Sequence, residues 1–472
     1  MKAGIAGGVA LIASNGASSQ GNTRQFVSQR PAAADRKFVS PAVDEFIQSV
    51  KQRIADPEIA WMFENCYPNT LDTTVHFKED GGEGGVPDTF VITGDITAMW
   101  LRDSSAQVWH YLPLVNRDPR LKQLFQGLIS RQSECIILDP YANAYLEDPN
   151  EVSQWATDDT EMKPGIHEHK WEVDSLCYPV RLAHAYWKET GDTTPFNDKW
   201  ERAMDLVVQT FREQQRKHGH GPYYFERDGP KLDLSKDSSY GIPVKPVGLI
   251  YSSFRPSDDA TEYPFFIPSN FFAVTALRQM AEMFTKVRHN PAKAAEPEAF
   301  AAEVEVALNK YAVPEQLDRT RKIFAFEIDG FGNSLYMDDA GVPGLLSLPY
   351  LGICSPKDPV YVATREYAWS TENPWFFEGK YSGIGSPHTG PDTIWPMGTI
   401  LYGLTSTSKQ EVAAALAQLK ATHDGTGFIH ESFHMDDPAN FTRTWFAWVN
   451  SLFGEFIVQT LDRFPDLLAK PA

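Results

Sequence analysis

The feature that most constrains this chain is a helical spacing of apolar residues that recurs from residue 39 almost to the C-terminus. The first such stretch opens with Ser40 as N-cap and Pro41 as first helical residue, and apolar residues then fall on one face at Val43, Phe46, Ile47, Val50 and Ile54. The same spacing predicts helices over residues 121–137, 176–188, 200–216, 273–284, 298–311, 410–421 and 445–457. Counting weaker segments, we expect about a dozen helices.

Other local signals are sparse. Ser408 and Glu411 form a capping-box pattern before the helix at 410–421. Strand signals are short, and they occur at residues 89–93, 223–226 and 323–328. The chain is therefore predicted to be mainly helical.

The segments between the predicted helices are long and rich in Gly, Pro, aromatic and acidic residues. They cover residues 66–98, 138–175, 219–269, 328–400 and 423–441. Structureless loops beyond about 12–15 residues are usually functional in a compact domain. Since composition does not change sharply after residue 38, we predict one domain over residues 39–472. The expected fold is all-α dominated: an (α/α)6 barrel, a toroid of helical hairpins, with long loops and a few short strands on the active-site face.

The N-terminus has the pattern of a targeting segment. In residues 1–20, one lysine is followed by a short apolar run and then by small residues, which is typical of a signal peptide. The apolar run also resembles that of a twin-arginine signal, and an Ala/Gly-rich tail is the alternative. Residues 21–38 are polar and are expected to form a linker. We expect an exported protein, periplasmic or secreted, and no membrane-spanning helix, because no other segment has 18 uninterrupted apolar residues.

Composition excludes several classes of protein. The 472 residues include 43 Lys and Arg against 62 Asp and Glu, a formal charge of −19, which argues against nucleic acid or anionic lipid as a partner. A hydrophobic fraction of 42% excludes a mainly disordered chain. Most of the 12 Trp, 18 Tyr and 29 Phe residues belong to the core, but such rings also stack on sugars. The four cysteines show no zinc-ligand spacing, and either one disulfide or four free thiols fits.

Two loop segments place acidic residues just before predicted helices. In residues 94–105, Arg102 and Asp103 could hold two adjacent sugar hydroxyls, because one side chain donates and the other accepts; an ordinary helix N-terminus is the alternative. In residues 170–175, Glu172 and Asp174 are either helix caps or acids that face a pocket.

Two further segments carry candidate catalytic carboxylates. Asp258 and Asp259 are adjacent, and such a pair either complements a helix N-terminus or forms a general acid with a partner that raises its pKa. Glu431 follows a glycine-rich turn and lies between His430 and Ser432, a pattern that is more often structural than functional.

Other chemistries lack their motifs. The chain has no GxSxG elbow, no GxGxxG after a strand, no P-loop and no HExxH. His167, Glu168 and His169 come closest to a metal pattern, but alternate histidines in a loop are more often solvated or hydrogen-bonded. Two carboxyl groups without a cofactor are the chemistry of glycoside cleavage.

Five motifs resemble glycoside hydrolase family 125. They occur in the order TGDITAMWLRDSSAQ (93–107), WEVDSLCYP (171–179), FRPSDDA (254–260), IPSNFFAV (267–274) and GFIHESF (427–433). The resemblance extends from about residue 40 to 465. It implies an (α/α)6 barrel and an exo-acting α-mannosidase, specific for α-1,6-linked mannose of N-glycan or mannan type. Such enzymes invert the anomeric centre and use no metal or other cofactor. We also expect a monomer.

The resemblance also implies roles for residues. Glu431 corresponds to the general base and Asp258 to the general acid, with Asp259 as the alternative acid. Arg102 and Asp103 correspond to the subsite for the terminal mannose. The same motifs supply the remaining candidate substrate-binding residues, Trp100, Glu172, Asp174, Arg255 and His430.

Two other functions remain open. One is another inverting (α/α)6 glycosidase acting on α-glucosides, since glucoamylase-like enzymes share the fold and also use two carboxyl groups as acid and base. The other is a non-catalytic, exported glycan-binding protein that uses the same cleft.

Overall fold

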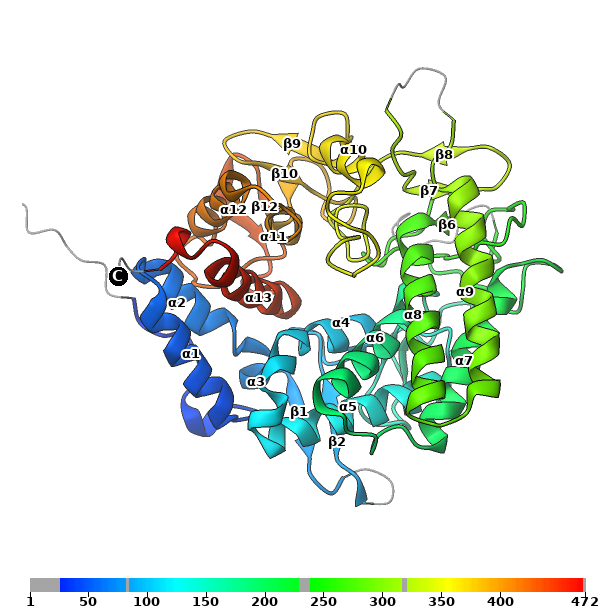
Figure 1. Cartoon of the computed structure of the whole chain (residues 1–472), viewed down its shortest axis with the longest axis horizontal. Coiled ribbons are helices and arrows are strands. Elements are labelled where there is room, and N and C mark those ends of the chain that lie inside the picture. Colours follow the sequence, from blue (N-terminus) through cyan, green and yellow to red (C-terminus); the bar gives the residue numbers. More distant parts are fainter. Residues whose placement is uncertain (1–25, 82–84, 229–237, 316–320, 470–472) are drawn as a thin grey trace, which may run out of the picture.

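The computed structural model describes residues 26–81, 85–228, 238–315 and 321–469. Its helices form a closed ring (Figure 1), and they are α1 (Pro41–Arg53), α2 (Pro57–Cys66), α3 (Asn69–Thr73), α4 (Leu101–Ala106), α5 (Pro119–Leu138), α6 (Val173–Thr190), α7 (Asp198–Gln214), α8 (Ile267–Lys286), α9 (Pro291–Tyr311), α10 (Pro359–Ala368), α11 (Pro396–Leu404), α12 (Lys409–Thr422) and α13 (Ala447–Arg463). Helices α4, α6, α8, α11 and α13 lie on the inner side of the ring, while α2, α9 and α12 lie outside (Figure 1). The predicted (α/α)6 barrel is confirmed.

The helices begin in two different ways. Five helices, α1, α2, α5, α9 and α10, start with a side-chain N-cap followed by proline, at Ser40, Asp56, Asp118, Asn290 and Asp358. Among the described residues, no side chain caps α4, α6, α8, α11 or α13, and these inner helices follow Trp100, Glu172, Phe266, Trp395 and Phe446. Good N-caps stabilise a helix by about 1 kcal/mol. The sequence therefore forgoes this stabilisation at the helix ends that surround one face of the barrel.

Short antiparallel strands bring the chain into these inner helix ends. Within the described residues they form small sheets in the orders β1-β2, β3-β4-β5, β6-β7-β8, β10-β9 and β11-β12-β13. Their bounds are β1 (Val75–Lys78), β2 (Asp88–Val91), β3 (Met99–Trp100), β4 (Ala144–Tyr145), β5 (Ile166–Glu168), β6 (Phe265–Phe266), β7 (Glu327–Ile328), β8 (Ser334–Leu335), β9 (Phe376–Glu378), β10 (Ser382–Ile384), β11 (Thr393–Ile394), β12 (Ser432–His434) and β13 (Asp437–Thr442). Strands β3, β6 and β11 end within two residues of α4, α8 and α11, so the strands fix where these helices start.

The core fills the ring and extends between its two layers. Nearly all buried apolar side chains belong to one continuous cluster. Close approach of the inner layer is visible at Gly454 on α13, where a Cβ atom would come within 2.8 Å of the ring of Tyr67. The ring is closed where the backbone of Ala55 donates to the carbonyl of Leu468 over 2.7 Å.

The structure confirms only some of the predicted strands and only part of the predicted capping box. The strand expected at 89–93 is β2, whereas 223–226 makes only a single bridge from Glu226 to Asp159, and 323–328 contributes only the two residues of β7. In the capping box, Ser408 does accept from the backbone of Glu411. The carboxylate of Glu411 binds Arg365 and Ser406 instead, because these donors lie within 2.7 Å of it.

The structure tests the predictions for the N-terminal segment only in part. The signal peptide expected at residues 1–20 lies outside the described residues. The described part of the expected linker contacts the helical domain: Arg30 pairs with Asp72 at 2.7 Å and with Asp44 at 2.8 Å, and Phe38 is buried. In the described ranges, no helix is both long enough and apolar enough to cross a membrane. The four cysteines, all within these ranges, are free thiols.

Candidate active site

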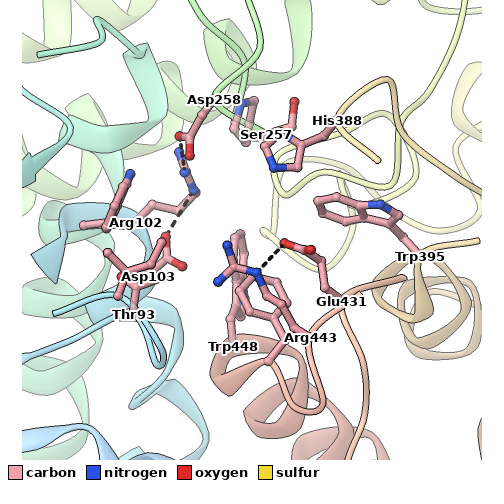
Figure 2. A pocket seen from close by; sticks show the side chains of 14 residues that line it. Thr93, Arg102, Asp103, Ser257, Asp258, His388, Trp395, Glu431, Arg443 and Trp448 are labelled. Carbon is pink, nitrogen blue, oxygen red and sulfur yellow. Dashed lines mark hydrogen bonds and ion pairs between the residues drawn. The ribbon is translucent and has the colours of Figure 1, made fainter. Parts of the chain in front are cut away.

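A pocket opens where the uncapped inner helices begin. It holds about 460 Å³ of space, its open mouth included. Its lining comes from the starts of α4, α11 and α13 and from the loops at 256–258, 388 and 431–446, and it consists of Thr93, Ile96, Trp100, Arg102, Asp103, Pro256, Ser257, Asp258, His388, Trp395, Glu431, Arg443, Phe446 and Trp448. Figure 2 shows Asp258 and Glu431 on different walls of this pocket.

Arg102 is the centre of a buried charge cluster on one wall. Its Nη1 donates to Glu172 Oε2 at 2.5 Å and to Asp174 Oδ2 at 3.4 Å, and its Nη2 donates to Asp258 Oδ1 at 3.0 Å. Its Nε lies 3.5 Å from Asp103 Oδ2. Four carboxyl groups thus share one buried guanidinium, and so many like charges cannot all be ionised in a site with little solvent.

The protonation of this cluster follows from burial. Burial raises the pKa of Asp103 to about 6, and it raises the pKa values of Glu172 and Asp174 as well. Burial also disfavours the charge on Asp258, but Arg102 and Lys170 outweigh it, so the pKa of Asp258 lies below its ordinary value in the free protein. A proton in the cluster therefore favours Glu172 over Asp258.

A tight turn separates the two neighbouring acids of the SDD motif. Asp258 has φ +66°, a left-handed conformation that Asp tolerates better than most residues. The turn is closed by the amide of Arg255 donating to the carbonyl of Asp259 at 2.8 Å and by the amide of Asp258 donating to the carbonyl of Arg255 at 2.9 Å. As a result the Asp258 side chain lines the pocket and is 25% exposed, while that of Asp259 is 3% exposed.

Asp259 instead binds a histidine of the opposite loop. Its carboxylate accepts from Ser257 Oγ at 3.0 Å and lies 3.2 Å from Nδ1 of His388, whose ring lines the pocket. Burial disfavours a charge on His388, but the hydrogen bond and charge of Asp259 prevail and raise the pKa of His388 to about 9. His388 is therefore a cation at neutral pH, held at the pocket wall.

Glu431 is held on the facing wall. Its Oε1 lies 3.2 Å from Nε of Arg443, whose Nη1 also pairs with Asp95. Arg443 is itself in a left-handed conformation, with φ +51°. The ion pair fixes the orientation of a carboxylate that is 9% exposed and borders the pocket.

The candidates from the sequence divide into three groups. Those that line the pocket are Trp100, Arg102, Asp103, Asp258 and Glu431. Glu172 and Asp174 lie behind Arg102 and are fully buried. Arg255, Asp259 and His430 do not line the pocket.

The third group has structural partners that explain its position. Arg255 Nε donates to Glu327 at 2.6 Å, and the other oxygen of Glu327 accepts from the backbone of the 262–263 turn. His430 stacks on Phe441, with ring centroids 3.7 Å apart. Substrate contact by Arg255 and His430 is therefore not supported, because neither residue borders the pocket.

The first two motifs do lie at helix starts, since Asp103 and Asp174 belong to the first turns of α4 and α6 and Glu172 directly precedes α6. Within the described chain, neither α4 nor α6 has a side-chain cap, and Asp103 and Glu172 instead meet Arg102. Sequence reasoning missed His388, Trp395 and Arg443. The glycine- and proline-rich segment around residues 385–396 is part of a long loop in the sequence, and no pattern singles out its histidine.

The histidine pattern at 167–169 has other partners. His169 Nδ1 lies 2.6 Å from Thr160 Oγ1 and its Nε2 lies 3.3 Å from Asp139, while His167 packs edge-on against Trp100. In the part of the chain that the structure describes, no three His, Cys, Asp or Glu residues are grouped as a metal site would require.

A family model described as metal-independent α-mannosidase, GH125, matches residues 56–458. The chain belongs to this family. It is therefore a glycoside hydrolase, as the five motifs indicated.

Two relatives of this glycoside hydrolase are similar over most of their length. A metal-independent α-mannosidase of Streptococcus pneumoniae, solved in a non-productive complex with α-1,6-mannobiose, is 42% identical with a TM-score of 0.86, over 90% of this chain and 99% of that one. The meiotically up-regulated gene 157 protein of Schizosaccharomyces pombe is 38% identical, over 94% of this chain and 90% of its own.

More distant structures share only the fold of the enzyme. A bacterial glucoamylase complexed with acarbose is 11% identical with a TM-score of 0.53, over 89% of this chain and 58% of that one. Identity this low carries no information about substrate.

Proposed function

We propose that this enzyme is an exo-acting, inverting, metal-independent α-mannosidase that releases terminal mannose from α-1,6-linked mannosides of N-glycan or mannan type. The observation that carries the proposal is the pair of carboxyl groups, Asp258 and Glu431, on different walls of one pocket (Figure 2). The streptococcal relative, which binds α-1,6-mannobiose, supports the substrate class.

In this proposal Asp258 is the general acid and Glu431 the general base. The oxygen that leaves with the next sugar needs a proton as its bond to C1 breaks, and Asp258 supplies it. Glu431, oriented by Arg443, removes a proton from the water that attacks C1 from the other face. One displacement by water then inverts the anomeric centre.

The remaining pocket residues hold the terminal sugar. Trp100, Trp395 and Trp448 offer apolar ring surface for the C–H face of a sugar. Asp103 offers a carboxylate that can accept from a sugar hydroxyl. Arg102 has fewer donors left for the sugar, because they are already directed to carboxylates. A pocket formed by converging helix ends, with carboxyl groups on different walls, suits one terminal sugar and thus exo action.

The α-glucosidase alternative rests on fold alone, so the family assignment favours mannosides. The test is product analysis by chromatography with α-1,2-, α-1,3-, α-1,4- and α-1,6-mannobiose, with maltose and isomaltose as controls. Mannose released fastest from the α-1,6 disaccharide is the expected result. Glucose release with no mannose would show an α-glucosidase, and binding of mannobiose without hydrolysis would show a glycan-binding protein.

Export and a monomeric state are part of the same proposal. The N-terminal pattern of residues 1–20 supports export to the periplasm or medium, where mannan and glycoprotein glycans occur. Cell fractionation with an antibody tests the location, and light scattering tests the oligomeric state.

A further inference from the structure

The general acid has an unusual neighbour. Asp258 is paired with Arg102 at 3.0 Å, an arrangement that favours the ionised carboxylate, although an acid catalyst must carry a proton. A source for that proton therefore has to lie close to Asp258.

Glu172 lies at the required place. Its side chain is fully buried, and it shares a guanidinium with Asp258: Nη1 of Arg102 donates to Glu172 Oε2 at 2.5 Å, and Nη2 of Arg102 donates to Asp258 Oδ1 at 3.0 Å. Two carboxyl groups held this close to each other favour a state in which they carry one proton between them. Oε1 of Glu172 is buried and receives no hydrogen bond from an ordinary donor among the described residues. A proton on that oxygen would satisfy it.

The other carboxyl oxygen of Glu172, Oε2, has partners that favour the ionised form. Oε2 accepts from Nη1 of Arg102 at 2.5 Å and from Oγ of Ser175 at 2.7 Å, so the carboxylate is stabilised once its proton has left. The side chain is thus suited to both protonation states, as a proton store must be.

We propose that Glu172 is a positioning residue that stores the catalytic proton and passes it to Asp258. The proposal rests on the proposed function, in which Asp258 protonates the leaving oxygen. When a sugar fills the pocket, the proton passes from Glu172 to Asp258. Asp258 gives it to the glycosidic oxygen as the C1–O bond breaks. Glu431 holds the proton removed from water and returns it to solvent, and one solvent proton recharges the Glu172–Asp258 pair, so protons balance over a turnover.

Several charged groups set the proton affinity of this pair. Burial is the main cause of the raised pKa of Glu172, and the charge of Asp258 adds to it while Arg102 opposes it. The titratable groups around the pair are, from α4, Arg102 and Asp103; from β5, His167; from the loop before α6, Lys170; from α6, Asp174; and, across the pocket, His388.

The test compares two leaving groups. α-1,6-Mannobiose needs a proton on its leaving oxygen, whereas 2,4-dinitrophenyl α-mannoside loses a phenolate that needs none. Glu172→Gln keeps the shape and can still bind Arg102, but it holds no transferable proton. We expect kcat on mannobiose to fall at least about tenfold, as when acid catalysis is weakened, while kcat on the dinitrophenyl substrate stays close to wild type. Equal losses on both substrates, or no loss on either, would overturn the proposal.

The pH profile gives a second readout. The rate on mannobiose falls as pH rises through the apparent pKa of the pair. Glu172→Gln should move this basic limb to lower pH, because Asp258 alone beside Arg102 loses its proton more easily. Ser175→Ala should move it to higher pH, because the ionised form of Glu172 loses a hydrogen bond. Limbs that stay fixed, or move the other way, contradict the proton store.

Controls separate this proposal from folding and from the proposed function. Glu455→Gln changes a half-buried glutamate in the middle of α13, which binds Tyr350 and does not border the pocket, and it should leave the profile unchanged. If circular dichroism shows that Glu172→Gln does not fold, the shift of the basic limb in Ser175→Ala tests the proposal by itself. In the double variant with Asp258→Asn the losses should not multiply, because the two residues act as a unit; losses that multiply overturn the proposal. A wild-type enzyme inactive on every mannoside would refute the proposed function instead.

Discussion

Asp258 and Asp259 are neighbours in the chain, yet their carboxylates lie in different surroundings. Asp258 lines the pocket and pairs with Arg102, while Asp259 is buried and binds Ser257 and His388. The left-handed backbone at Asp258 produces this divergence. Of the two residues between which the sequence left the general acid, only Asp258 lines the pocket, and the proposed mechanism therefore uses Asp258.

Replacement of each of the two acids by asparagine should lower kcat by unequal amounts. Asp258→Asn should lower kcat on α-1,6-mannobiose at least about 10²-fold, the usual minimum for a lost general acid. Asp259→Asn removes no proton donor from the pocket, so a smaller loss is expected, caused by displacement of His388. Steady-state kinetics of both variants, with circular dichroism as a folding control, measures this. A dead Asp259→Asn beside a nearly normal Asp258→Asn would reverse the assignment.

Loss of the base should be as severe as loss of the acid. Glu431→Gln should lower kcat at least about 10²-fold because the attacking water keeps its proton. Arg443→Ala should cost less, since Arg443 orients Glu431 but does not itself take the proton from water. Glu378→Gln, an exposed glutamate of β9, is the matched control and should be normal. Near-normal kcat for Glu431→Gln would remove Glu431 from the mechanism.

The Asp259–His388 pair should make stability depend on pH. Because Asp259 raises the pKa of His388 from an unfolded value near 6.5 to about 9, the pair stabilises the fold fully below pH 6.5 and loses this effect as pH rises through 9. The melting temperature of Asp259→Asn should thus lie below wild type at pH 6, by a difference that shrinks toward pH 10. Thermal melts across this range test it. A difference that grows with pH, or a dependence on pH that persists in the His388→Gln background, would contradict the pairing.

Chelation of metal ions should leave the activity unchanged. The proposed mechanism needs only two carboxyl groups, and the family is described as metal-independent. Mannoside hydrolysis should be the same before and after dialysis against EDTA. Activity that disappears on dialysis and returns with Ca²⁺ or Zn²⁺ would refute a metal-free mechanism.

The helices of the barrel could be predicted from the sequence because each buries one face of a local 3.6-residue pattern. The helix that begins at Ser40 and Pro41, for example, ends at Arg53 as the pattern indicates. Strands of two or three residues, such as Glu327–Ile328, are too short to produce a periodic signal.

The site was only partly predictable, and the reason is distance along the chain. Motifs identified Arg102, Asp258 and Glu431, but Arg102 and Asp258 lie 156 residues apart, and no local pattern reports that they form an ion pair. His388 belongs to the long loop at 328–400, in which no motif singles out this histidine, so its contact with Asp259 emerges only from the fold. His430 is the reverse case. Its motif predicted a binding role, but its ring stacks on Phe441 and does not line the pocket.

The central claim is that Asp258 and Glu431 act on opposite faces of the sugar in a single displacement. Inverting enzymes hold the two carboxyl groups roughly 6.5–9.5 Å apart, with room for a water, and retaining enzymes about 5–5.5 Å apart. Proton NMR of the first minutes of α-1,6-mannobiose hydrolysis, before mutarotation, reads the outcome directly. We predict that β-mannose appears first and that added methanol is not captured as methyl α-mannoside. If α-mannose appears first, Glu431 is a nucleophile or the pair is misassigned, and the inverting mechanism is wrong.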